Sequence, residues 1–320
     1  MKIKMGTIKD IVDINDRIDN SYNGTCFAYD WFLKLKKSNK ILRIYDNDKL
    51  IGFMPIFSNN NPNKVIFQST MYIPYGGPVL FDVPTEERHK IKYIRSIEKE
   101  LINYLQKKYT ELDFSIDTKI TDIMPFIRSG FIIENRYTYK LDLGIGLENL
   151  YEKFGHDRRK DIRKAFNKEL KFIVDDKMKY FDPNEAMKWE KNYGSESTVK
   201  ETEKYIKKTL EKERGMCFVA LDEDIVIGGV HIAWDKNTAY ILYSYYERKN
   251  DDIAIAFLYY KIFEYLIANK IVRYIDFEGS VFESIEDWNI SFGAYQERFY
   301  NLHWNKLGKT YPNIYDYGEK

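Results

Sequence analysis

Residues 274–280 alternate hydrophobic and polar side chains, which predicts a strand that ends in carboxylates. The hydrophobic positions are Ile275 and Phe277, and the polar positions include Asp276 and Glu278. A period of two residues is typical of a strand. Ligands of open α/β sheets bind at the carboxyl ends of the strands, so we expect Asp276 and Glu278 to lie at a functional site.

A short helix and another strand are predicted directly after this strand. Residues 284–292 carry Ile285, Trp288 and Phe292 at helical spacing, and Gly293 then supplies a left-handed stop. Residues 295–304 are predicted to form the next strand.

The same order of elements occurs in both halves of the chain. Each half is predicted to contain a hairpin, a long helix, a strand, a short helix ended by glycine, and a final strand. In the first half these elements span 41–57, 85–107, 112–116, 121–128 and 131–143; in the second they span 216–246, 252–269, 272–278, 284–292 and 295–304. We infer two copies of one α/β unit, with domains at 1–145 and 146–320.

The most basic segment of the chain lies between the two copies. Residues 153–171 hold eight Lys and Arg residues against three Asp and Glu residues. Hydrophobic side chains at helical spacing predict an amphipathic basic helix over 150–168. Arg159 and Arg163 are four residues apart and share one face of that helix, where two guanidinium groups suit a phosphate. The alternative is a solvated basic face.

Composition narrows the class of protein. The chain has 320 residues, 44% hydrophobic and 31% charged, which is typical of a soluble globular protein with two domains. The formal net charge of +1 gives no indication of DNA binding. No hydrophobic run is long enough for a membrane span, and the N-terminus lacks a signal-peptide pattern, so we expect a cytoplasmic protein.

Cysteine and histidine residues give little indication of special chemistry. Cys26 and Cys217 are expected to be buried thiols, because two cysteines do not make a disulfide framework. The four histidines lack ligand spacing, so no metal site is expected. His231 lies within a predicted strand and is expected to be a core residue.

The residues also resemble a known family. The segments RKDIRKA at 159–165, DFEGS at 276–280, FGA at 292–294 and YGGPVL at 75–80 are similar to the FemABX family of peptidoglycan-bridge peptidyltransferases and its acetyltransferase-like relatives. The order of elements resembles the GNAT acyltransferase fold in tandem. This resemblance implies an α/β (α+β) protein with two GNAT-like domains, each a mixed central sheet flanked by helices.

The resemblance also implies an activity. A Fem-like N-acyltransferase moves an aminoacyl or acyl group from an activated ester or thioester to an amine of a cell-envelope or sugar-nucleotide acceptor. The implied co-substrate is aminoacyl-tRNA or acyl-CoA, with no tightly bound cofactor. The implied partners are a phosphate-bearing small molecule or cell-wall precursor and the acceptor end of tRNA.

Two segments depart from the pattern and leave alternatives open. GNAT enzymes hold the CoA pyrophosphate in a glycine-rich loop at a helix N-terminus. Here residues 248–254 have Asp251 and Asp252 and no glycine, and residues 83–87 are also acidic. The family's aromatic–lysine pair is replaced by Trp288 and Asn289. The alternatives are an acetyl-CoA-dependent small-molecule N-acetyltransferase and a non-catalytic tandem GNAT-like binding protein.

Candidate site residues follow from both lines of reasoning. A carboxylate or tyrosine at the strand end could take the proton of an attacking amine, and the alternative for the carboxylates is helix capping or ion pairing. Glycines permit a tight turn or a close approach of substrate. The candidate catalytic residues are Glu278, Asp276 and Tyr246, and the candidate substrate-binding residues are Arg159, Arg163, Tyr243, Tyr75, Gly76 and Gly77.

Overall fold

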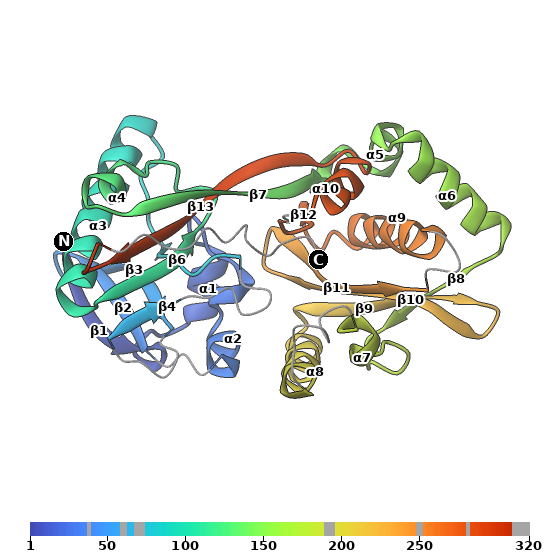
Figure 1. Ribbon diagram of the computed structural model, residues 1–320, viewed down its shortest axis with the longest axis horizontal. Coiled ribbons are helices and arrows are strands. Elements are labelled where there is room, and N and C mark those ends of the chain that lie inside the picture. The colour runs from blue at the N-terminus through green and yellow to red at the C-terminus, as the bar shows by residue number, and fades with distance from the viewer. Residues whose placement is uncertain are drawn as a thin grey trace. The chain divides into compact units, whose positions relative to one another are not determined.

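The chain forms two compact α/β units (Figure 1). The computed structural model describes residues 1–36, 40–57, 63–66, 74–188, 196–247, 252–279 and 282–308. The first unit comprises residues 1–137 and the segment from residue 297 onward, and the second comprises residues 138–296. Two units built from mixed sheets and helices agree with the predicted fold class.

The boundary between the units corrects the predicted division at 145/146. Strand β7 (Ile132–Asp142) continues across residue 137, and strand β13 (Tyr295–Asn305) continues across residue 296. The C-terminal strand belongs largely to the first unit because it pairs antiparallel with β6 (Glu111–Ile116) in that unit. Local periodicity predicts the strand but not its partner.

The sheets of the first unit contain the predicted hairpin. One sheet has the strand order β1-β2-β3-β5. The second sheet begins with the strand order β4-β6-β13-β7. Asn47 has a φ of 52° in the tight turn of the hairpin, a conformation that asparagine tolerates. The strands not yet given are β1 (Lys2–Thr7), β2 (Lys40–Asp46), β3 (Lys49–Ile56), β4 (Lys64–Ile66) and β5 (Val79–Leu80).

The helices of the first unit include the predicted long helix, α3 (Glu87–Lys108). Its buried face carries Ile94, Ile97 and Leu101 at helical spacing. Gly130, with a φ of 79°, follows the short helix α4 as predicted. The other helical segments are η1 (Ile8–Asp10), α1 (Ile14–Asp19), η2 (Cys26–Ala28), α2 (Asp30–Leu35) and α4 (Met124–Arg128).

The sheet of the second unit has the order β7-β12-β11-β10-β9-β8. Strand β12 is parallel to β11, and the other pairs are antiparallel. These strands are β8 (Lys171–Asp175), β9 (Gly215–Asp222), β10 (Ile225–Trp234), β11 (Thr238–Tyr246) and β12 (Tyr274–Asp276).

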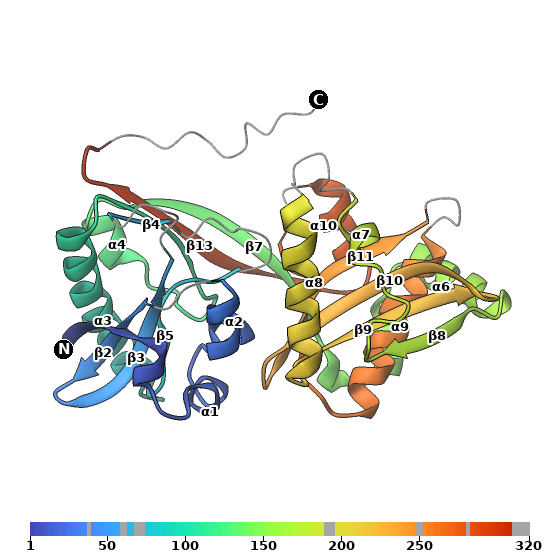
Figure 2. The same ribbon diagram turned by 90° about the horizontal axis from the view of Figure 1, so that it is seen from below.

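Helices cover both faces of this sheet. In Figures 1 and 2, α9 lies on one face of β9–β11, and α7 and α8 lie on the other. Helix α9 is buried along most of its length, which explains its largely hydrophobic sequence. The helical segments are η3 (Leu143–Ile145), α5 (Leu147–Lys153), α6 (His156–Asn167), α7 (Pro183–Ala186), α8 (Glu196–Glu211), α9 (Ile253–Ala268) and α10 (Glu283–Ile290).

The predicted basic helix over 150–168 is two helices. The chain leaves the helical conformation at Phe154 and Gly155, between α5 and α6. The backbone N–H of Gly155 donates to the carbonyl of Ser291, 2.7 Å away, and Phe154 is buried against Phe263 and Phe292. This tertiary contact ends α5.

The elements around residue 280 largely match the sequence interpretation. Gly293 has a φ of 77° after α10, which confirms the predicted left-handed stop. Strand β12 is shorter than predicted and ends at Asp276, because Glu278 turns into the left-handed region with a φ of 59°. The sequence interpretation missed β1 and α8.

Candidate functional site

Strands β11 and β12 separate at their carboxyl ends. Their ladder joins only Thr238–Tyr240 to Tyr274–Asp276, whereas β11 continues to Tyr246. A register irregularity in the β10–β11 pairing makes Leu242 an extra residue of β11. Beyond Asp276 the described parts of these two strands share no ladder pairs, and this is the end of the sheet where open α/β folds bind ligands.

Asp276 is buried at the end of β12 and anchors the turn that follows. Only 1% of the residue is exposed. Its Oδ1 accepts a hydrogen bond from the hydroxyl of Thr138 on β7 and a second from the backbone N–H of Glu278, at 2.8 Å. Asp276 therefore holds the chain in place where it leaves the strand.

Glu278 presents a partly buried carboxyl group directly after this turn. Its Oε1 has no hydrogen-bond partner among the described residues. Burial, and secondarily the negative charge of Asp276, raise the pKa of Glu278 well above its usual range. A carboxylate with a raised pKa is a stronger base than an ordinary one, which suits the removal of a proton from an amine.

The candidate tyrosines of β11 lie on opposite faces of the sheet. Tyr243 is buried against the rings of His231 and Tyr205, on the side of α8. Tyr246 instead lies beside Gly228 and the first turn of α9. Because neighbouring strand residues alternate, Tyr243 and Tyr246 lie on opposite faces of the sheet, and the roles of both remain predictions.

The hydroxyl group of a tyrosine in the core of the second unit lies near the separated strands β11 and β12. Tyr259, on α9, has its hydroxyl within hydrogen-bonding reach of Ser244 and Trp288. Burial raises the pKa of Tyr259 to about 12, so the phenol is neutral at physiological pH. Its ring also lies 5.8 Å from that of Phe277, next to Glu278.

The arginines of the basic segment have different environments. Arg159 donates from its Nη1 to the carbonyl of Glu152, 3.0 Å away, and so caps the C-terminus of α5. Arg163 is exposed on α6. The role of Arg159 and Arg163 in phosphate binding remains a prediction. The guanidinium of Arg159 already binds a backbone carbonyl of the fold.

The sequence interpretation did not single out Arg158, on α6, whose side chain is 12% exposed. Its guanidinium lies 4.0 Å from the ring centre of Trp288, and its Nη2 is 3.5 Å from Asp161 and 3.6 Å from Asp252. Asp252 immediately precedes α9. Arg158 therefore places a positive charge at the start of α9 and offsets the acidic residue there; the rest of the segment 248–251 lies outside the described residues.

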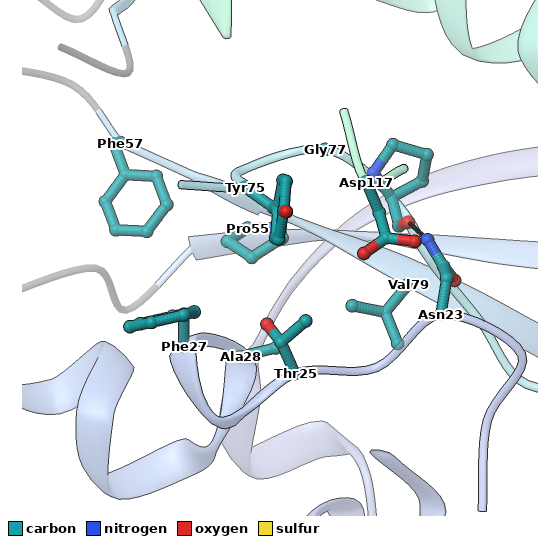
Figure 3. Close-up of a pocket in the computed structure, with 11 residues that line it drawn as sticks. Asn23, Thr25, Phe27, Ala28, Pro55, Phe57, Tyr75, Gly77, Val79 and Asp117 are labelled. Carbon is teal, nitrogen blue, oxygen red and sulfur yellow. Dashed lines mark hydrogen bonds between the residues drawn. The ribbon is translucent and has the colours of Figure 1, made fainter. Parts of the chain in front are cut away.

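The first unit contains a small pocket that includes two of the candidate residues (Figure 3). Its cavity of about 10 Å³ is just large enough for one water-sized group. The lining combines side chains from the segment before α2, the end of β3, the turn before β5 and the end of β6: Asn23, Thr25, Phe27, Ala28, Pro55, Phe57, Tyr75, Gly77, Pro78, Val79 and Asp117.

Oxygen atoms and aromatic rings surround this pocket. Figure 3 shows the Asp117 carboxylate and the hydroxyl groups of Tyr75 and Thr25 around the same space. Asp117 is 8% exposed, and its Oδ1 accepts a hydrogen bond from the backbone N–H of Lys119. A Cβ on Gly77 would lie 2.8 Å from Ile116, so close packing against β6 accounts for this glycine.

The described residues contain no group of three or more His, Cys, Asp or Glu side chains arranged to hold a metal ion. Among the same residues, no helix is long and hydrophobic enough to cross a membrane. Cys26 and Cys217 are buried free thiols, and His231 is fully buried, as the sequence predicts.

Comparison with solved structures defines the class of fold as tandem GNAT. The chain matches the crystal structure of FemX with a TM-score of 0.62 at 12% identity, covering 94% of this chain and 97% of that chain. A tandem GNAT protein from the clavulanic acid biosynthesis pathway matches with a TM-score of 0.55 at 10% identity, covering 97% and 100% of the respective chains.

L-PGS from Bacillus licheniformis also shares the fold, with a TM-score of 0.54 at 12% identity over 91% of this chain and 90% of that chain. No protein-family model and no curated protein sequence matches the chain. The FemABX-like, tandem GNAT resemblance seen in the sequence is therefore confirmed at the level of the fold.

The structure places some of the candidate residues close together and others apart. Asp276 and Glu278 are linked by a hydrogen bond at the predicted strand end. Tyr75 and Gly77 line one pocket, whereas the described lining does not include Gly76. The sequence interpretation missed Thr138, Arg158 and Asp117. Of these, Asp117 directly follows the predicted strand 112–116, so the argument from the end of a strand could have found it.

Proposed function

We propose that the protein is a GNAT-type N-acyltransferase that moves an aminoacyl or acyl group to an amine of a cell-envelope or sugar-nucleotide acceptor. The observation that carries the proposal is the separation of β11 from β12, with the carboxyl group of Glu278 at the end of the shorter strand. The tandem GNAT fold supports the reaction class.

In this mechanism Glu278 is the general base. The amine nitrogen bonds to the carbonyl carbon of the donor, and its proton passes to the Glu278 carboxylate. The bond from that carbon to the leaving oxygen or sulfur then breaks, and the leaving atom takes up the proton from Glu278, which regenerates the carboxylate. Orienting the amine and the donor supplies much of the remaining rate enhancement.

The donor is proposed to be an aminoacyl ester or an acyl thioester. Asp252 disfavours a pyrophosphate at the start of α9, whereas Arg158 beside it restores a positive charge. We therefore propose testing aminoacyl-tRNA and acyl-CoA side by side. A donor that binds the native protein raises its melting temperature, which separates the two possibilities.

A substitution of Glu278 tests the proposed role. Glu278→Gln keeps the shape of the side chain but removes the base, so we expect transfer to fall by about 100-fold or more. The readout is amide product formed from the donor that raises the melting temperature. Glu283→Gln, at an exposed position at the start of α10, is the matched control and should retain full activity. Unchanged transfer by Glu278→Gln would refute the role of Glu278.

We also propose that the pocket of the first unit binds an ammonium group of a substrate. A buried carboxylate and aromatic rings suit a small cation, and the cavity fits a group of that size. Asp117→Asn retains an oxygen that accepts from Lys119 but removes the charge. We expect binding of an amine-bearing acceptor to weaken about tenfold, measured by calorimetry. Asp82→Asn, at an exposed ion pair, should leave binding unchanged; equal affinities of all three proteins would contradict the proposal.

A further inference from the structure

We infer that Thr138, acting through the carboxylate of Asp276, is a positioning residue for Glu278. This inference rests on the proposed role of Glu278 as the base. It assigns Asp276 a supporting role, in contrast to the catalytic role expected from the sequence. It also gives β7 a part in the site, although β7 carries none of the candidate residues.

Two hydrogen bonds to one oxygen atom form the connection. The Thr138 hydroxyl and the Glu278 backbone N–H both donate to Oδ1 of Asp276. Thr138 and Asp276 are each 1% exposed, so water does not replace these bonds readily. Glu278 has a φ of 59°, which disfavours a residue with a Cβ, and the bond from its N–H fixes this conformation.

The neighbouring strands add two titratable groups. Asp276 is in register with Lys140 on β7 and with Tyr240 on β11. The Thr138 hydroxyl stabilises the negative charge of Asp276, since a hydrogen bond to an ionised group is strong in a buried site. That charge in turn makes the Glu278 carboxyl group hold its proton more tightly. Thr138 thus controls both the conformation and the proton affinity of Glu278.

The experiment titrates the Glu278 carboxyl group in the unliganded protein. Carbon-13 NMR of protein labelled at the glutamate carboxyl carbons follows each group with pH, and the signal absent from Glu278→Gln identifies Glu278. In Thr138→Val, Asp276 loses a donor, so it holds the turn at Glu278 and its own charge less firmly. We expect the pKa of Glu278 to fall by about one pH unit.

Two further variants make the result specific. Thr138→Ser keeps the hydroxyl group and should titrate like the wild type. Asp276→Asn removes the charge but keeps the acceptor oxygen, and should also lower the pKa of Glu278; it serves as the test if Thr138→Val does not fold. An unchanged Glu278 titration in a folded Thr138→Val or Asp276→Asn variant would overturn the inference.

The titration needs no substrate, so its outcome does not depend on whether the proposed function is correct. If the titration shifts as expected but Glu278→Gln transfers at the wild-type rate, Glu278 is not the base. The coupling then stands, but Thr138 has no part in transfer. If Glu278→Gln is inactive and the titration does not shift, the proposed role of Glu278 stands and that of Thr138 is refuted.

Discussion

At the scale of single residues, Glu98 is an unusual carboxyl group in the interior of the first unit. It lies on the buried face of α3 and is 1% exposed. Neither of its oxygens has a hydrogen-bond partner among the described residues. Burial, with a smaller contribution from the charge of Asp122, raises the pKa of Glu98 to about 9, so the group is neutral at physiological pH.

This carboxyl group makes the free energy of unfolding depend on pH. Above a pH of about 4.5 the unfolded chain loses the proton that the folded chain retains, so stability falls as the pH rises toward 9. Glu98→Gln removes this dependence. We expect it to stabilise the protein by about 3 kcal/mol at pH 7 and to have little effect near pH 4.5, measured from urea unfolding.

Glu100→Gln is the matched control, because Glu100 is exposed on the same helix. It should change the unfolding free energy by less than about 0.5 kcal/mol at either pH. If the difference in unfolding free energy between Glu98→Gln and the wild type is the same at pH 4.5 and pH 7, the Glu98 carboxyl group is ionised in the folded state.

The sequence predicts site residues that lie together on one segment of alternating hydrophobic and polar side chains. Asp276 and Glu278 follow from the end of a single alternating segment. Thr138 does not, because its hydrogen bond to Asp276 joins residues 138 positions apart. Arg158 has the same sequence neighbourhood as Arg159, and only the docking of α6 against Trp288 distinguishes them.

At the scale of elements, a buried histidine fixes β13 in the first unit. His303 is 5% exposed at the side chain, and its ring nitrogens lie 3.3 Å from Asp113 on β6 and 3.4 Å from Glu134 on β7. Burial lowers the pKa of His303, but hydrogen bonds to these carboxylates and their charges outweigh it and raise the pKa to about 9. The imidazolium therefore links three strands.

The sign of the pH dependence follows from the raised pKa. The stabilisation is fully present below a pH of about 6.5, the unfolded value, and is lost as the pH rises through about 9. We expect His303→Gln to destabilise the first unit by about 3 kcal/mol at pH 6, with a smaller loss at pH 9. Hydrogen exchange of the β6 amides measures the change.

His89→Gln is the control, since His89 is exposed at the start of α3. Its β6 amides should exchange at the wild-type rate at both pH values. If His303→Gln lowers the protection of β6 equally at pH 6 and pH 9, the histidine contributes by packing and not by charge.

Strong local patterns predict elements, whereas tertiary contacts set their ends. The strands and the glycine stops at Gly130 and Gly293 follow from the sequence. The break at Gly155 does not, because its hydrogen bond to Ser291 comes from a distant segment. Helix α8 was missed because its buried positions Thr202, Tyr205, Ile206 and Thr209 include two threonines, which weaken the hydrophobic stripe.

At the scale of the whole molecule, two GNAT-like units account for the order of elements along the chain. Repetition of that order predicts the tandem fold, and the matches to FemX and the tandem GNAT protein confirm it. The unit boundary could not be predicted in the same way. The chain returns to the first unit through β13, and this pairing depends on residues nearly 190 positions away.

We propose that the separated strands β11 and β12 form an acyl-transfer site with Glu278 as the base. The most direct measurement is single-turnover formation of amide from a bound aminoacyl or acyl donor, compared between the wild type, Glu278→Gln and Glu283→Gln. We expect product with the wild type and with Glu283→Gln, and a loss of about 100-fold or more with Glu278→Gln. Equal rates for all three proteins would contradict it.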